Sequence, residues 1–213
     1  MARKIRVALL GDSQAQGLSP HLGAELDRRG MRLVARLTIP GVSTARLLDR
    51  HLEALREVVH GADRVIVALG GNDYGLGGEA GRRTYRFRLG RMRSELKGKD
   101  VLWLGPAYAL DPEVYRVHHR ARALQKRFFR STPVRWVDSY PATRSGHAAD
   151  GVHFTRAHYS RWARTVAKEA SELGGSGWLW PVAIGVGAVV VAGLVKKRAA
   201  MRLSRRAQRV QGS

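Results

Sequence analysis

The chain has 213 residues, and 44% of them are apolar, so it can bury a hydrophobic core and is not expected to be disordered. Its 38 basic residues against 17 acidic ones give a net charge of +21, which favours anionic partners without singling one out. The absence of cysteine excludes disulfides, a thiolate metal site and a cysteine nucleophile.

Short apolar runs alternate with helix-like segments along the chain. The runs cover residues 5–10, 32–37, 64–69, 100–105 and 134–137. The helix-like segments cover residues 19–30, 42–61, 80–97, 112–130 and 155–173, the first opening on a Ser-Pro pair. Short continuous apolar runs are typical of strands buried on both faces of a sheet. The alternation predicts an α/β fold with a five-stranded parallel sheet and helices on both faces.

Polar or glycine-rich turns follow four of the predicted strands. They cover residues 11–13, 40–43, 70–73 and 146–155. In an open α/β sheet, ligands bind beyond the carboxyl ends of the strands, where these turns lie. We therefore expect the four turns to converge on one edge and to hold the functional site.

The side chains in these turns fit acyl transfer. A serine hydroxyl such as that of Ser13 needs a base and a group that orients the base, and Asp150 and His153 supply such a pair. The developing oxyanion needs hydrogen-bond donors. Candidate donors are the backbone N–H groups of Ser13 and Gly41 and the side-chain amide of Asn72.

Each motif taken alone also has an ordinary structural interpretation. The serine of "GDS" fits a helix N-cap, a lone glycine fits a turn, "GGND" fits a turn, and an Asp-x-x-His spacing fits a surface helix start. Their joint occurrence, in this order and after these strands, favours a hydrolase site.

The four motifs together resemble a known superfamily. "GDSQ" with Ser13, the isolated Gly41, "GGND" with Asn72 and "DGVH" with Asp150 and His153 resemble the four blocks of the SGNH hydrolases, the GDSL-like esterases and lipases. The resemblance implies that Ser13 is the nucleophile, that His153 is the general base and that Asp150 orients it. It also implies an oxyanion hole formed by Ser13, Gly41 and Asn72.

The resemblance covers about residues 5–173 and carries an expectation for the fold. The superfamily has a three-layer, flavodoxin-like architecture with strand order 2-1-3-4-5. One residue departs from its pattern, because Gln14 stands where a leucine usually follows the serine. This departure bears on the acyl pocket more than on the chemistry.

The sequence assigns less specific roles to other polar and aromatic residues near these turns. Asp73 is expected to be a structural cap, and Tyr74, Tyr108 and Tyr159 are candidates for lining an acyl or sugar pocket. No cofactor and no metal site is predicted, because the histidines show no metal-ligand spacing such as His-Glu-x-x-His.

The C-terminal part of the chain has a different composition from the rest. The sequence predicts a hydrolase domain over residues 1–173, a Gly/Ser linker over 174–177, a transmembrane helix over 178–195 and a basic tail over 196–213. Residues 178–195 carry no charge and include two tryptophans of the kind that anchor at membrane interfaces. The alternative is a glycine-rich apolar helix that packs on a partner or on the domain itself.

The side of the membrane stays open at this stage. Basic segments next to a membrane helix tend to stay in the cytoplasm, which would place the hydrolase domain outside. The apolar stretch at the N-terminus, however, is too short for the signal peptide that export of the domain would need. Insertion from the C-terminal end would leave the domain in the cytoplasm. A phage-encoded enzyme that meets the membrane from outside avoids the conflict.

The sequence therefore predicts a membrane-tethered serine esterase acting on a short acyl ester, such as an O-acetyl group on an envelope glycan. Two alternatives are a lipase or thioesterase acting on lipids and a non-catalytic, membrane-anchored binding module. The basic tail is a candidate for contact with an anionic polymer or lipid, and nucleic-acid binding is not expected as the main role.

Overall fold

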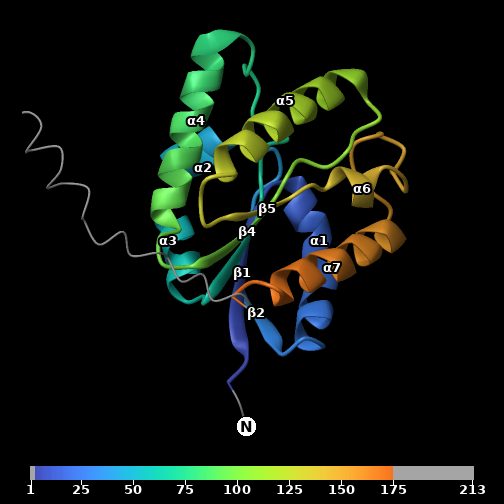
Figure 1. Cartoon of the computed structure of the whole chain (residues 1–213). Coiled ribbons are helices and arrows are strands. Elements are labelled where there is room, and N and C mark those ends of the chain that lie inside the picture. The colour runs from blue at the N-terminus through green and yellow to red at the C-terminus, as the bar shows by residue number, and fades with distance from the viewer. Residues whose placement is uncertain (1–2, 175–213) are drawn as a thin grey trace, which may run out of the picture. The chain divides into compact units, whose positions relative to one another are not determined.

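A parallel sheet of five strands, in the order β2-β1-β3-β4-β5, forms the centre of the protein in a computed structural model that describes residues 3–174 (Figure 1). The strands are β1 Ile5–Gly11, β2 Met31–Thr38, β3 Arg64–Ala68, β4 Asp100–Leu104 and β5 Arg135–Val137. Each lies within one residue of its predicted apolar run. The strand order confirms the expectation that came from the superfamily resemblance.

Two helical layers cover the sheet (Figure 1). Helices α1 Ser13–Asp27 and α7 Arg156–Ser171 pack on one face, where Val7 and Leu9 of β1 point. Ala8 and Leu10 point to the opposite face. The helices on that face are α2 Thr44–Arg50, α3 Leu52–His60, α4 Gly78–Glu95 and α5 Pro112–Phe129. This alternation buries both faces of the central strands β1, β3 and β4, which is why their sequences read as continuous apolar runs, whereas the edge strands β2 and β5 are only partly buried.

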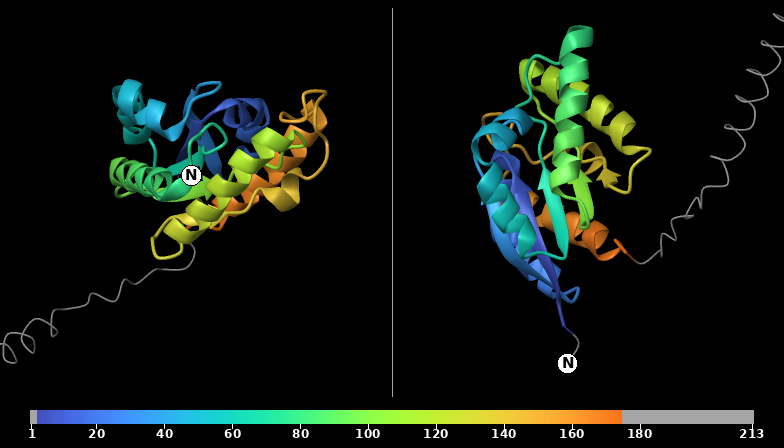
Figure 2. Two further views of the ribbon diagram at one scale, coloured as in Figure 1. Left: turned by 90° about the horizontal axis from the view of Figure 1, so that it is seen from above. Right: turned by 90° about the vertical axis from the view of Figure 1, so that its left-hand side faces the viewer.

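Helices α4 and α5 lie side by side on their face of the sheet, as both views of Figure 2 show. A short helix, α6 Tyr140–Thr143, contacts α7 on the other face and was not predicted. Its four residues are too few to show a helical period in the sequence.

The first helix begins earlier than the sequence predicts. It starts at Ser13 instead of Ser19, because the Asp12 carboxylate caps it by accepting the backbone N–H of Gln14 at 2.9 Å. Pro20 consequently lies inside the helix, although proline more often occupies the first turn. The buried leucines of α1 pack against the sheet on both sides of this proline and hold the helix together.

The predicted helix over residues 42–61 is two helices. His51 has a φ of −131° and a ψ of 22°, which leave the helical region and end α2, and α3 starts at the next residue. The leucines of both helices still contact one core cluster, so the apolar pattern alone does not reveal the break.

Among residues 3–174, no helix is long and apolar enough to cross a bilayer. The predicted transmembrane helix over 178–195 and the basic tail over 196–213 lie outside the described residues, as does the predicted linker after Gly174. These three assignments remain predictions.

Candidate active site

The ends of three neighbouring strands bring the polar turns together. Gly11 of β1 pairs with Thr38 of β2 on one side and with Ala68 of β3 on the other, so the chain leaves all three strands at the same level. The turns that follow them, with the loop before α7, line a pocket of about 240 Å³. Its lining includes Ser13, Gln14, Gly41, Asn72, Tyr74, Val114, Val152 and His153.

The end of β1 places Ser13 at the start of a helix. A Cβ atom on Gly11 would lie 2.3 Å from the carbonyl oxygen of Ala68, so only glycine fits where the chain leaves the sheet. Asp12 then caps α1, and Ser13 is its first residue. The side chain of Ser13 therefore faces the pocket from a rigid helix N-terminus.

His153 lies within hydrogen-bond distance of both Ser13 and Asp150. The Nε2 atom of His153 is 2.9 Å from the Ser13 Oγ, and its Nδ1 atom is 2.6 Å from the Asp150 Oδ2. The ionised Asp150 accepts the Nδ1 proton, which leaves Nε2 as the acceptor for the serine hydroxyl. The structure thus brings together the three residues that the sequence singled out.

Asp150 is held in its charged form. The hydrogen bond from His153 is the largest cause, and the backbone N–H groups of Val152 and His153, each 2.9 Å from Oδ1, add to it. Together they lower the pKa of Asp150 to about 2. The carboxylate therefore stays negative throughout the neutral pH range.

The predicted oxyanion donors border the same pocket. Gly41 has a φ of +68°, a conformation that favours glycine, and a Cβ atom there would meet no protein atom within 4 Å. The side-chain amide of Asn72 donates one hydrogen to the Asp12 Oδ2 at 3.1 Å, and its second hydrogen is available for a ligand. With the N–H of Ser13 at the helix start, three donors border one space.

Asp12 is a site residue that the sequence reasoning did not single out. Its side chain is almost fully buried, and it contacts both the first turn of α1 and the amide of Asn72. Burial raises the pKa of Asp12 to about 7, and repulsion from Asp73 adds to the rise, against the opposing hydrogen bonds from Gln14 and Asn72. The "GDS" motif placed it in the right turn but gave no sign of its burial.

Asp73 has the structural role that was predicted for it. Its carboxylate accepts the backbone N–H of Thr44 at 3.1 Å and the Thr44 hydroxyl at 2.6 Å, which ties the turn after β3 to the start of α2. Burial raises the pKa of Asp73, and the hydrogen bonds from Thr44 oppose the rise.

The three candidate tyrosines have different positions. Tyr74 lines the pocket and is exposed, whereas Tyr108 stacks edge-on against Tyr115 and Tyr140 and is not among the pocket residues. Tyr159 is buried between α7 and α1 and does not line the pocket either. The prediction of a pocket-lining tyrosine is therefore correct for Tyr74 alone.

His118 also lines the pocket, although the sequence did not predict a place for it in the site. Its Nδ1 lies 2.6 Å from the carbonyl oxygen of Ala107, and burial lowers the pKa of His118, so the ring is neutral at pH 7. Among residues 3–174, no cluster of His, Asp and Glu has the arrangement of a metal site.

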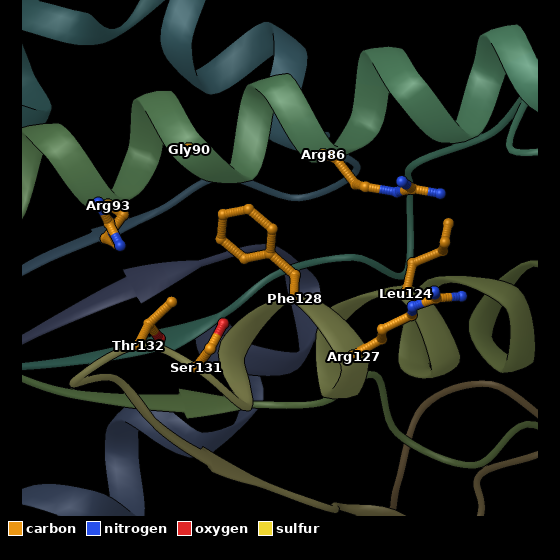
Figure 3. Close-up of a pocket in the computed structure, with 8 residues that line it drawn as sticks. All are labelled: Arg86, Gly90, Arg93, Leu124, Arg127, Phe128, Ser131 and Thr132. Atoms are coloured by element: carbon orange, nitrogen blue, oxygen red, sulfur yellow. The ribbon is translucent and has the colours of Figure 1, made fainter. Parts of the chain in front are cut away.

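A second hollow of about 470 Å³ lies between α4 and α5, away from these residues (Figure 3). Arg86 and Arg93 approach it from α4, and Arg127 and Phe128 approach it from α5, with the phenyl ring between the ends of the groove. Within the described part of the chain, none of these three arginines forms an ion pair, whereas Arg91 on α4 pairs with Asp49.

A parallel α/β sheet with a hydrogen-bonded serine, histidine and aspartate at its carboxyl edge is the arrangement of an SGNH-type hydrolase. The sequence model of the GDSL-like Lipase/Acylhydrolase family matches residues 9–169. The chain belongs to this family, and the resemblance drawn from its motifs is confirmed.

Solved structures show the same fold. A lipase/acylhydrolase from Enterococcus faecalis is 22% identical, with a TM-score of 0.63 over 79% of this chain and 97% of that one. An acetylxylan esterase from Geobacillus stearothermophilus is 18% identical, with a TM-score of 0.58 over 80% of this chain and 95% of that one. A carbohydrate acetylesterase from Sinorhizobium meliloti is 16% identical, with a TM-score of 0.57 over 78% and 98%. No curated protein matches the sequence.

Proposed function

We propose that the protein is a serine esterase that hydrolyses short acyl esters through an acyl-enzyme intermediate. The observation that carries this proposal is the continuous chain of hydrogen bonds from Ser13 through His153 to Asp150. A serine hydroxyl at its ordinary pKa is a weak nucleophile, and a base within hydrogen-bond distance of its oxygen activates it.

In the first half of the reaction, the Ser13 Oγ attacks the ester carbonyl carbon while its proton moves to the His153 Nε2. The carbonyl oxygen becomes an oxyanion that accepts hydrogen bonds from the N–H groups of Ser13 and Gly41 and from the Asn72 amide. When the bond to the alcohol oxygen breaks, His153 gives its proton to the departing alkoxide. The alcohol leaves, and the acyl group stays on Ser13.

In the second half, water replaces the alcohol. His153 takes a proton from the water as the oxygen attacks the acyl carbon, and the same donors hold the second oxyanion. The bond to the Ser13 Oγ then breaks, His153 returns the proton to Ser13, and the carboxylic acid leaves. Asp150 stays ionised throughout and holds the positive imidazolium in place.

The size and lining of the pocket support a short acyl group. Its volume of about 240 Å³ is below the usual range of about 300 to 1,000 Å³ for drug-sized ligands. Val114, Val152 and Tyr74 give it a limited apolar wall. Two similar structures are those of an acetylxylan esterase and a carbohydrate acetylesterase, which supports an O-acetyl group on a glycan as the substrate.

We also propose that the enzyme works at a membrane, held there by a helix over residues 178–195, and that an envelope glycan carries the ester. The uncharged segment and the basic residues after it support this placement. The arginines of the α4–α5 groove, which have no ion-pair partner among residues 3–174, support an anionic polymer as a partner.

The test is hydrolysis of p-nitrophenyl esters of two, four and eight carbons and of acetylated xylooligosaccharide by the full chain. Ser13→Ala is compared with Ser94→Ala, which changes an exposed serine on α4. We expect the acetate to be the best nitrophenyl ester and Ser13→Ala alone to abolish turnover. Preference for the eight-carbon ester would indicate a lipase, and folded protein without Ser13-dependent activity would indicate a binding module.

A further inference from the structure

Gln14 occupies a buried position directly after Ser13, and both of its polar side-chain atoms have partners. Its Oε1 accepts the hydroxyl of Tyr159 at 3.0 Å, and its Nε2 donates to the carbonyl oxygen of Val152 at 2.9 Å. A buried amide with both ends bonded is held in one orientation. Leucine, the residue usual at this position in the superfamily, forms neither bond.

Tyr159 reaches Gln14 because α1 carries a glycine one turn further on. A Cβ atom on Gly17 would lie 2.2 Å from the tyrosine ring, so the ring occupies the space that any other side chain would take. Burial raises the pKa of Tyr159 to about 12, so its hydroxyl keeps its proton and donates at neutral pH. The contact thus joins α7 to the first turn of α1.

The other partner of Gln14 lies in the loop that carries His153. Val152 is the residue before His153, and Asp150 fixes the backbone N–H groups of both. Among the described residues, the bond from Gln14 to Val152 is the only hydrogen bond between α1 and residues 150–153 besides the contact of Ser13 with His153. It therefore joins the same two segments, α1 and the loop, between which the Ser13 proton must move.

We propose that Gln14 is a positioning residue that sets the distance between the Ser13 Oγ and the His153 Nε2, an inference that rests on the proposed esterase function. Ser13 belongs to α1 and His153 to a loop 140 residues later in the chain. Gln14 links these two segments through its hydrogen bond to Val152, and the hydrogen bond from Tyr159 fixes the orientation of the Gln14 amide. A displacement of about 1 Å at such a contact lowers a rate by up to about 100-fold.

A purely structural role for Gln14 makes different predictions. If Gln14 only filled the core, leucine would serve equally well, because it is of similar size and apolar. If Gln14 acted only as a wall of the pocket, its replacement would change KM for the ester and leave kcat in place. A positioning role lowers kcat while KM changes little; because the loss of two buried hydrogen bonds also lowers the thermal midpoint, kcat is compared well below that midpoint.

The experiment compares Gln14→Leu with Gln16→Leu, a matched change at an exposed position of the same helix. Tyr159→Phe removes the other partner with the smallest change of shape and serves as a second, milder variant. Each full-length variant is assayed for kcat and KM on p-nitrophenyl acetate and for its thermal midpoint.

We expect Gln14→Leu to lower kcat by about 10- to 100-fold, with KM within about threefold and Gln16→Leu unchanged. Tyr159→Phe lowers kcat less, and the double variant loses less than the product of the two single effects, because both changes break one chain of contacts. If the natural chain shows Ser13-dependent turnover while Gln14→Leu and Tyr159→Phe keep kcat within twofold, the inference is wrong. If the natural chain shows no such turnover, the proposed function fails instead.

Discussion

The pocket around Ser13 and the groove between α4 and α5 are both hollows bordered by polar side chains, yet they differ in how these side chains are held. In the pocket, the imidazole of His153 and the amide of Asn72 each have a partner that fixes their orientation. In the groove, which is about twice as large, Arg86 and Arg127 have no carboxylate partner among the described residues. Oriented groups can move a proton, whereas unpaired charges can attract an anion.

The two regions also differ in what they cost the fold. The pocket keeps a carboxyl at Asp12 that is almost fully buried, and burying such a group is unfavourable. The groove arginines are exposed and cost little. A costly arrangement is a stronger sign of function than a large hollow, so changes in the pocket should impair hydrolysis more than changes in the groove.

Loss of the base should have the largest effect. His153→Ala leaves Ser13 without a proton acceptor, so we expect kcat on p-nitrophenyl acetate to fall by about 10⁴-fold or more. His119→Ala, at an exposed position on α5, serves as the control. A His153→Ala enzyme with more than about a tenth of the natural rate would refute the role of the pocket.

Loss of one oxyanion donor should have an intermediate effect. Asn72→Ala removes the amide that Asp12 orients, and we expect kcat to fall by about 10² to 10³ with little change in KM. Steady-state kinetics on the acetate ester measure both constants. A change confined to KM would mean that Asn72 binds the substrate equally in the ground state and in the transition state.

The buried Asp12 carboxyl should make stability depend on pH. Its pKa is raised to about 7, so between pH 4 and pH 7 the folded state keeps a proton that the unfolded chain has released. The free energy of unfolding therefore decreases as the pH rises through this range. From pH 5 to pH 8 the natural chain should lose about 2 kcal/mol relative to Asp12→Asn.

Urea unfolding of both proteins at the two pH values measures this difference. The comparison cancels the other titrating groups, including Asp73, whose raised pKa acts in the same direction, and Asp150, whose lowered pKa acts below pH 4. The same pH dependence in both proteins would show that Asp12 is ionised at pH 5.

Changes in the groove should have the smallest effect on hydrolysis. Arg86→Ala with Arg127→Ala removes two charges that have no carboxylate partner among residues 3–174 and that do not line the pocket, so kcat/KM on p-nitrophenyl acetate should stay within about twofold. Binding of the same variant to an acidic polysaccharide at low salt should weaken. A large loss of turnover would contradict the separation of the two regions.

The sequence predicted the parts of this fold and site that depend on local pattern. Buried strands read as apolar runs, and the turns after them carried Ser13, Gly41 and Asn72 because parallel strands end at one edge. The spacing of Asp150 and His153 predicted that both side chains lie on one face of a turn-like or helical stretch, and the structure joins them by a hydrogen bond.

Features that depend on contacts between residues far apart in the chain could not be predicted from the sequence. The hydrogen-bond partners of Gln14 are Val152 and Tyr159, both more than 130 residues away in the chain. The residues next to Gln14 do not show whether this glutamine links two segments or is an unusual core residue. The start of α1 was misplaced because Ser19-Pro20 resembles a stronger helix start than Asp12. The burial of Asp12 arises from α1, β3 and the turn with Asn72 meeting in space.

Covalent labelling can identify the nucleophilic serine directly. The full chain is treated with a fluorophosphonate, which reacts with activated serine hydroxyls, and the labelled peptide is located by mass spectrometry. We expect one adduct, on Ser13, that forms as ester hydrolysis is lost and that does not form in His153→Ala. Inhibition with the adduct on another serine, or hydrolysis that persists after Ser13 is fully labelled, would contradict this expectation.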